Sequence, residues 1–283
     1  MNEFTKSTTL ESSLEEVIAS LATNNSVIAV LQIGSLSRDQ LTPASDYDLI
    51  IIVDGIEPLW YVGVTQIEYR LTDLIFVNST AIKAILDLEA PLPQEDELTP
   101  IIRWLRDGRI LFARTQTTLQ AKQKVQNGRW LKPVSDKTAY DTWFSINYNL
   151  AQLRRMIMAD DPLYKQVAAI RMAVYAYSDL WFGYFTLRKL DWAGDKAAYR
   201  YLQEHDLLYL QTYQQLIHSQ AGLWDKFVIY EKIVALATAP VGCIWPNDVT
   251  IMNHEQQSAL WQELLDYENQ HFAKQAVLFS NRA

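Results

Sequence analysis

Residues 27–48, VIAVLQIGSLSRDQLTPASDYD, decide the fold of the first part of this chain. The apolar run VIAVLQI ends in a Gly-Ser pair, and two aspartates one residue apart open a second apolar run, LIIIV, at 49–53. Short runs rich in Val and Ile are typical of buried strands. The pattern therefore predicts two strands, at about 27–33 and 47–53, joined by a polar loop.

The two aspartates stand where they can act together. Side chains alternate faces along a strand, so Asp46 and Asp48 point to one face and Tyr47 to the other. Carboxylates about 7 Å apart along one face can converge on divalent cations, and magnesium takes one or two carboxylates together with phosphates and water. Gly34 allows the backbone to approach a triphosphate closely, and Ser35 offers a hydroxyl donor. The spacing favours magnesium-dependent nucleotidyl transfer.

The same order of features resembles a known family. An apolar strand, Gly-Ser, about ten residues and Asp-x-Asp at the head of the next strand resemble the signature of the DNA polymerase beta-type nucleotidyltransferase superfamily, over roughly residues 10–118. The superfamily has a third carboxylate on a later strand, and Asp73 in LTDLIFV at 71–77 matches it. The segment RDGRILFAR at 106–114 resembles the one that closes this catalytic domain in bacterial members.

The resemblance implies a set of site residues. The catalytic carboxylates, which are also the ligands of the Mg²⁺ cofactor, would be Asp46, Asp48 and Asp73, and the nucleotide would be held by Gly34 and Ser35. Asp73 would complete the metal site or accept the proton of the acceptor hydroxyl. Glu68 is an alternative third carboxylate, because only the strand register decides between Glu68 and Asp73.

A basic segment in the second half of the chain extends this expectation. LRKLDWAGDK at 187–196 loosely resembles a basic stretch in the second domain of some bacterial nucleotidyltransferases. Lys196 is the expected contact to the triphosphate, with Arg188 and Lys189 behind it. The alternative is that these three charges are solvated at the end of a helix.

Length and organisation predict two domains. The chain has 283 residues, a length that exceeds the usual size of a domain with a single core. Hydrophobic residues make up 49% of the sequence. Strand patterns at about 27–33, 47–53, 66–77 and 109–113 give way near residue 118 to helical patterns at 117–127, 137–159, 162–190, 195–218, 221–237 and 254–279. The predicted fold class is α+β, with a small mixed β-sheet domain at 1–118 that has helices on one side, followed by an all-α helical bundle at 119–283. The helix at 162–190 is expected at the buried centre of the bundle.

Charge and composition limit the classes of molecule that the protein is expected to bind. The net charge of −8 disfavours nucleic acid, which requires clustered Lys and Arg, and suits a small or cationic acceptor. The uncharged stretch at 17–37 is interrupted by polar residues and predicts no membrane span. The N-terminal residues lack a secretory pattern and Cys243 is the single cysteine, so a cytoplasmic location is expected.

Together these features predict an enzyme most like the bacterial nucleotidyltransferases that modify aminoglycoside or lincosamide antibiotics. It would move a nucleoside monophosphate, AMP being the expected one, from a nucleoside triphosphate to a hydroxyl of a small, possibly cationic acceptor. Two alternatives stay open. One is an AMP-transferring or antitoxin-type regulator that acts on a protein, and the other is a catalytically silent nucleotide-binding protein.

Overall fold

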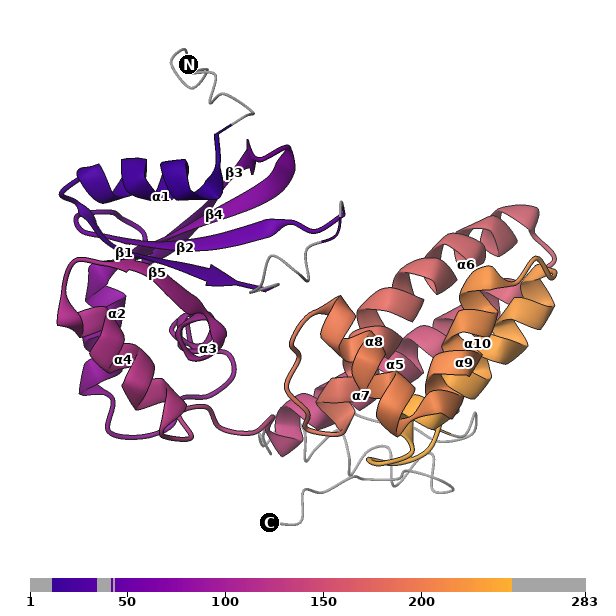
Figure 1. Cartoon of the computed structure of the whole chain (residues 1–283). Coiled ribbons are helices and arrows are strands. Elements are labelled where there is room, and N and C mark those ends of the chain that lie inside the picture. The colour runs from indigo at the N-terminus through magenta and orange to yellow at the C-terminus, as the bar shows by residue number, and fades with distance from the viewer. Residues whose placement is uncertain (1–11, 35–41, 43, 246–283) are drawn as a thin grey trace. The chain divides into compact units, whose positions relative to one another are not determined.

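A computed structural model describes residues 12–34, 42 and 44–245 of the chain (Figure 1). Ser35 and the helix predicted at 254–279 lie outside the described residues. The chain divides into two compact units, Met1–Lys132 and Pro133–Ala283, called the first and the second unit below. No helix in the described part is long and apolar enough to cross a membrane.

The first unit is built on a five-stranded mixed sheet with the strand order β3-β4-β2-β1-β5. Strands β2 and β4 are parallel, and the other neighbouring pairs are antiparallel. The strands are β1 (Val27–Ile33), β2 (Tyr47–Val53), β3 (Trp60–Ile67), β4 (Arg70–Asn78) and β5 (Arg109–Ala113). The predicted mixed sheet is confirmed.

Helices cover both faces of this sheet (Figure 1). On one face, α1 (Leu14–Thr23) packs Ile18 against Val30 and Ile51. The other face carries α2 (Ser79–Asp87), α3 (Thr99–Asp107) and α4 (Gln116–Gln126). The prediction of helices on one side therefore holds for α2 to α4 and is corrected for α1. The reason is that β2 is apolar on both faces, so both require a cover.

The boundary between the units lies at 132/133, after the predicted 118/119. Helix α4, expected in the helical domain, buries Ala121 and Val125 in the core of the first unit. Its Lys124 Nζ donates to the carbonyl oxygens of Leu86 and Leu88, both at 2.6 Å, at the end of α2. A cation that caps the carbonyl end of a neighbouring helix ties α4 to the sheet domain.

The single strand predicted at 66–77 is a hairpin. Strands β3 and β4 meet at a two-residue turn in which Glu68 and Tyr69 have φ values of 51° and 60°. Such turns are normally marked by Asn or Gly, and neither is present here. The sequence therefore carried no turn signal, and the partner strand was missed.

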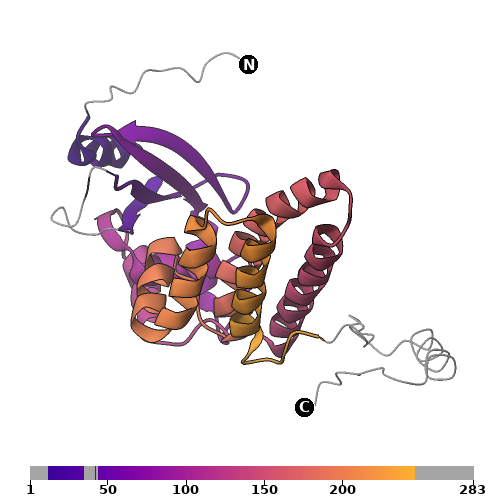
Figure 2. The ribbon, with the colours of Figure 1, turned by 90° about the vertical axis from the view of Figure 1, so that its right-hand side faces the viewer.

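The regular secondary structure in the described residues of the second unit is entirely helical, which confirms the predicted bundle. Its helices are α5 (Asp136–Ile157), α6 (Pro162–Tyr175), the π-helix η2 (Ala176–Trp181), α7 (Phe182–Leu187), α8 (Asp195–His205), α9 (Leu207–His218) and α10 (Leu223–Thr238). Helix α5 packs on α6, α7 and α10, and α10 also packs on α9 (Figure 2). The predicted helix at 162–190 runs through α6, η2 and α7, and the predicted helix at 195–218 is interrupted at Asp206.

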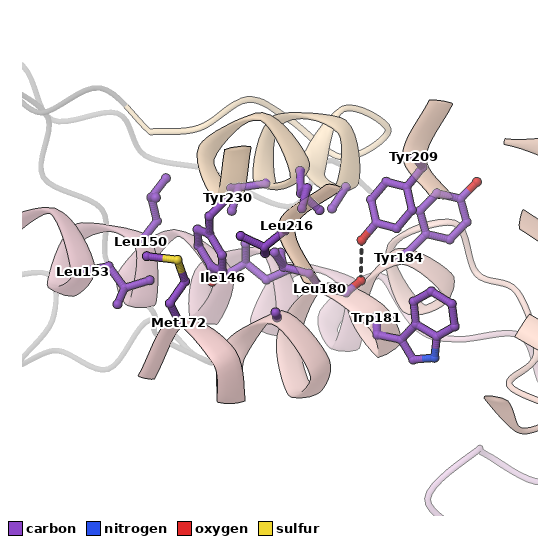
Figure 3. Close-up of a cluster of buried hydrophobic side chains, with 14 of the residues drawn as sticks. Ile146, Leu150, Leu153, Met172, Leu180, Trp181, Tyr184, Tyr209, Leu216 and Tyr230 are labelled. Carbon is purple, nitrogen blue, oxygen red and sulfur yellow. Dashed lines mark hydrogen bonds between the residues drawn. The ribbon is translucent and has the colours of Figure 1, made fainter. Parts of the chain in front are cut away.

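The core of the second unit is rich in tyrosine (Figure 3). The Tyr209 hydroxyl donates to the carbonyl oxygen of Leu180 at 2.6 Å, inside the core. Burial raises the pKa of Tyr209 well above its ordinary value, so its hydroxyl stays a hydrogen-bond donor. By contrast, Ile170 and Val174 of α6 are exposed, whereas Ala168 and Met172 of the same helix are buried, so the first half of the predicted central helix buries only one face.

Candidate functional site

Two of the three predicted carboxylates lie side by side in the sheet. Asp48 of β2 is the direct partner of Asp73 in the parallel pair β2–β4, and both side chains are half-buried. Paired residues on neighbouring strands project to the same face, with the strands about 4.8 Å apart. On the other side, Asp48 is paired with Ile33, the last residue of β1. Asp46 is exposed and lies two residues before Asp48.

Gly34 follows β1 directly and lies beside the Asp48 carboxylate. Its φ is +77°, in the left-handed region that side chains disfavour. A Cβ placed on Gly34 would lie 3.1 Å from Asp48 Oδ2. The missing side chain therefore leaves open space at the carboxylate and allows the turn that leads the chain away from β1.

Arg70 holds the segment that enters β2. Its guanidinium donates to the carbonyl oxygens of Thr42 and Ser45, the latter at 3.0 Å, and lies 5.9 Å from the centre of the Tyr47 ring. Ser45 Oγ accepts from the backbone N–H of Thr42 at 3.0 Å. These contacts fix the residues that lead directly into Asp46 and Asp48.

Glu68, the alternative third carboxylate, has a different neighbourhood. Its carboxylate accepts from the Tyr47 hydroxyl at 2.6 Å and from the backbone N–H of Leu14 at 3.2 Å. Tyr47 belongs to the face of β2 that packs on α1, opposite to the face of Asp48. The structure thus brings Asp73, and not Glu68, next to Asp48. The catalytic role of Asp73 stays a prediction.

No three side chains of His, Cys, Asp or Glu in residues 12–34, 42 and 44–245 are grouped so that they could hold a metal ion by themselves. The donors present at the sheet are carboxylates, which are the ligands of hard cations. Asp48 and Asp73 supply two of them in register.

The basic side chains predicted to bind phosphate in the second unit make different contacts. The Arg188 guanidinium donates to the carbonyl oxygens of Leu236 and Ala237, both at 3.1 Å, in the last turn of α10. It also lies 3.7 Å from the centre of the Tyr184 ring and 3.9 Å from Asp206. These contacts make Arg188 a cap of α10 and a link within the bundle.

Lys189 and Lys196 lie near the surface. Lys189 forms an ion pair with Asp136 at the start of α5. Lys196 lies in the first turn of α8, after Gly194 with its φ of +89°. Their contacts with phosphate, and that of Arg188, stay predictions.

Lys196 lines a pocket of about 640 Å³ in the second unit that the sequence did not predict. Half of the lining residues are aromatic, namely Tyr177, Trp181, Tyr199 and Tyr213, and the others are Asp195, Lys196, Arg200 and Ile217. Desolvation, followed by the hydrogen bond to Asp195 and its charge, raises the pKa of Tyr177, and burial above all raises that of Tyr213. Both hydroxyls therefore remain protonated donors. Of the two residues from the predicted central helix, Trp181 is buried and Tyr177 is exposed.

No protein-family model matches the chain. Over 83 residues the chain is 40% identical to a bifunctional uridylyltransferase/uridylyl-removing enzyme of Corynebacterium glutamicum, in a match that covers 24% of this chain and 12% of that enzyme.

Among solved structures, the chain is similar to a nucleotidyltransferase-like protein from Exiguobacterium sibiricum 255-15. The identity is 14% and the TM-score 0.40, with 80% of this chain and 76% of that chain covered. A TM-score of this size carries no argument about fold or function. The sequence match spans only a small part of the uridylyltransferase.

Proposed function

We propose that the first unit transfers a nucleoside monophosphate from a nucleoside triphosphate to a hydroxyl group, at the end of the sheet where Asp48 and Asp73 lie. The observation that carries the proposal is the register of β2 and β4, which pairs these two carboxylates directly. Gly34 beside them leaves space at the Asp48 carboxylate. The short match to a uridylyltransferase points to the same class of reaction.

The donor set fits magnesium bound together with its nucleotide. Two carboxylates in register, completed by phosphate oxygens and water, are what Mg²⁺ takes in such sites. When bound, the ion supplies charge neutralisation and orientation of the triphosphate. Asp48 and Asp73 are the proposed ligands, with Asp46 as a third carboxylate close by in the chain.

The chain's own residues would position the reacting groups. Gly34 permits close approach of the backbone to the triphosphate. In the reaction, the acceptor oxygen bonds to the α-phosphorus while the bond from that phosphorus to the bridging oxygen breaks and pyrophosphate leaves. The proton of the acceptor hydroxyl passes to a carboxylate or to solvent, and Asp73 is the proposed acceptor when it is not a metal ligand.

The proposed acceptor is a small hydroxyl-bearing molecule with positive charge. A net charge of −8 attracts cations and repels polyanions such as nucleic acid. The nucleotide is expected to be ATP. UTP is tested beside ATP, because the relative with the short sequence match is a uridylyltransferase.

A transfer assay tests the proposal. The protein is incubated with Mg²⁺ and each of the four α-³²P-labelled ribonucleoside triphosphates, together with aminoglycosides, lincosamides, RNA or cell-lysate protein. We expect label on a small molecule, and loss of at least about 10³-fold of the rate in Asp48→Asn, which corresponds to about 4 kcal/mol of transition-state stabilisation. Asp87→Asn removes an exposed carboxylate from the same unit and should leave the rate unchanged.

The other outcomes discriminate the alternatives. Label on a protein band alone would replace the small acceptor by a protein and favour the regulator. Label on RNA would contradict the acceptor proposal. Absence of transfer with every nucleotide and acceptor, combined with magnesium-dependent nucleotide binding, would favour the catalytically silent protein.

A further inference from the structure

The aromatic pocket of the second unit has the size and lining of a small-molecule site. Its volume of about 640 Å³ lies within the range of about 300–1,000 Å³ that is usual for such sites. Four aromatic rings contribute to the wall: Tyr177, Trp181, Tyr199 and Tyr213. Aromatic rings offer flat apolar surfaces on which a planar ligand can stack.

A π-helix builds one side of the pocket. Tyr177 and Trp181 both belong to η2, and both reach the same partner. Trp181 Nε1 donates to Asp195 Oδ1 at 3.0 Å, and the Tyr177 hydroxyl donates to Asp195 Oδ2 at 3.1 Å. π-Helices are rare and occur frequently at functional sites. The shared carboxylate shows that η2 turns both rings toward α8.

The wall is held in place by the bundle itself. The Tyr213 hydroxyl of α9 donates to the carbonyl oxygen of Ala176, the first residue of η2, at 3.0 Å. The Tyr213 ring packs on that of Trp181 with 4.9 Å between their centres. The hydroxyl of Tyr199 accepts from Gln214 Nε2 at 2.8 Å. A pocket whose side chains are fixed in advance costs a ligand little ordering.

The charges around the pocket favour an anionic ligand. Both oxygens of Asp195 already accept hydrogen bonds, from Tyr177 and Trp181. Arg200 is exposed and makes no ion pair or hydrogen bond with any residue that the structure describes. A guanidinium pairs in two-pronged fashion with carboxylate or phosphate and also stacks on rings. Arg200 and Lys196 together outnumber the single carboxylate of the lining.

From these contacts we infer that the pocket between η2, α8 and α9 binds a small planar aromatic molecule that carries one carboxylate or phosphate group. Its ring would lie against Tyr177 and Tyr199, and its anionic group would pair with Arg200. All lining residues belong to the second unit. The inference therefore does not depend on the transfer reaction proposed for the first unit.

Two probes that share the same aromatic ring system but carry opposite charges test the ligand class. Naphthalene-2-carboxylate and 2-naphthylmethylammonium are titrated into the full-length protein by ligand-observed NMR. We expect saturable binding of the carboxylate, at least about tenfold tighter than that of the ammonium, since hydrogen bonds to charged groups are strong enough for such a ratio. Equal binding of both, or tighter binding of the ammonium, would overturn the inference, as would absence of saturable carboxylate binding.

Matched variants locate the binding. Arg200→Gln should weaken the naphthalene-2-carboxylate affinity about tenfold, whereas Lys232→Gln, the same loss of charge on α10, should leave it within about twofold. Tyr199→Ala should weaken it about fivefold through loss of stacking, and Tyr199→Phe, which keeps the ring, should not. Unchanged affinity in both Arg200→Gln and Tyr199→Ala would place the probe elsewhere and overturn the site.

The same titration with 2-naphthyl phosphate distinguishes the two anionic groups. The tighter of the two anions identifies the class of the natural ligand, and either ranking supports the site as long as both depend on Arg200. Independence of both anions from Arg200 contradicts it.

Discussion

Two groups of charged residues that the sequence analysis singled out differ in how the fold arranges them. At the end of the sheet, Asp48 and Asp73 come from separate strands and are direct partners. In the second unit, Arg188 and Lys189 are neighbours in sequence, yet one caps α10 and the other pairs with the start of α5. The comparison teaches that pairing between strands brings charges together at one place. Charges at a helix end go to whichever carbonyl or carboxylate the tertiary fold brings near.

The largest expected effect on the free energy of unfolding lies in the second unit. Arg188→Met should lower the free energy of unfolding by about 2–3 kcal/mol, because the last carbonyls of α10 and the Asp206 carboxylate lose a charged partner. Lys189→Met breaks only an exposed ion pair and should cost about 0.5 kcal/mol or less. Urea denaturation followed by circular dichroism measures both. Equal costs would mean that Arg188 does not cap α10.

A second pair of variants separates the two candidate third carboxylates. Glu68→Ala removes the acceptor of the Tyr47 hydroxyl and of the Leu14 N–H, so we expect about 1–2 kcal/mol lower stability and unchanged magnesium-dependent nucleotide binding. Asp73→Ala should abolish that binding at little cost in stability. Urea denaturation and nucleotide titration of both variants check this, and the opposite result would make Glu68 the third carboxylate.

The smallest expected effect on stability concerns two glycines whose φ angles are nearly the same. Gly34 and Gly55 have φ values of +77° and +76°, but a Cβ at Gly55 meets nothing within 4 Å. Each substitution by Ala should therefore cost about 1 kcal/mol of backbone strain. Only Gly34→Ala should also weaken nucleotide binding, because its Cβ crowds Asp48 Oδ2. Equal nucleotide affinity in the two variants would contradict the proposed role of Gly34.

Much of the first unit follows from the sequence, for a physical reason. The runs at 27–33 and 47–53 predicted β1 and β2 at their observed bounds, because strands buried on both faces read as continuous apolar segments. The pairing of Asp48 with Asp73 depends on register, which no local pattern contains. Glu68 and Tyr69, as turn residues, lack the Gly or Asn that would have revealed the hairpin.

The second unit was less predictable. Apolar residues at helical spacing do not distinguish the core from an exposed face or a pocket wall. Of the predicted central helix, Ile170, Val174 and Tyr177 are exposed, whereas Trp181 is buried in the core as well as lining the pocket. A π-helix changes which residues share a face, and no simple periodicity of the sequence indicates where one forms. The aromatic pocket therefore appears only in the folded chain.

The central claim is that Asp48, paired with Asp73, forms a nucleotide site. Thermal unfolding of the protein and of Asp48→Asn, each with ATP or UTP in the presence and absence of Mg²⁺, tests it most directly. At a nucleotide concentration 100 times the dissociation constant, we predict about 2.7 kcal/mol of magnesium-dependent stabilisation of the protein. The same stabilisation is expected for the control Asp87→Asn, and none for Asp48→Asn. Full magnesium-dependent stabilisation of Asp48→Asn would contradict the account.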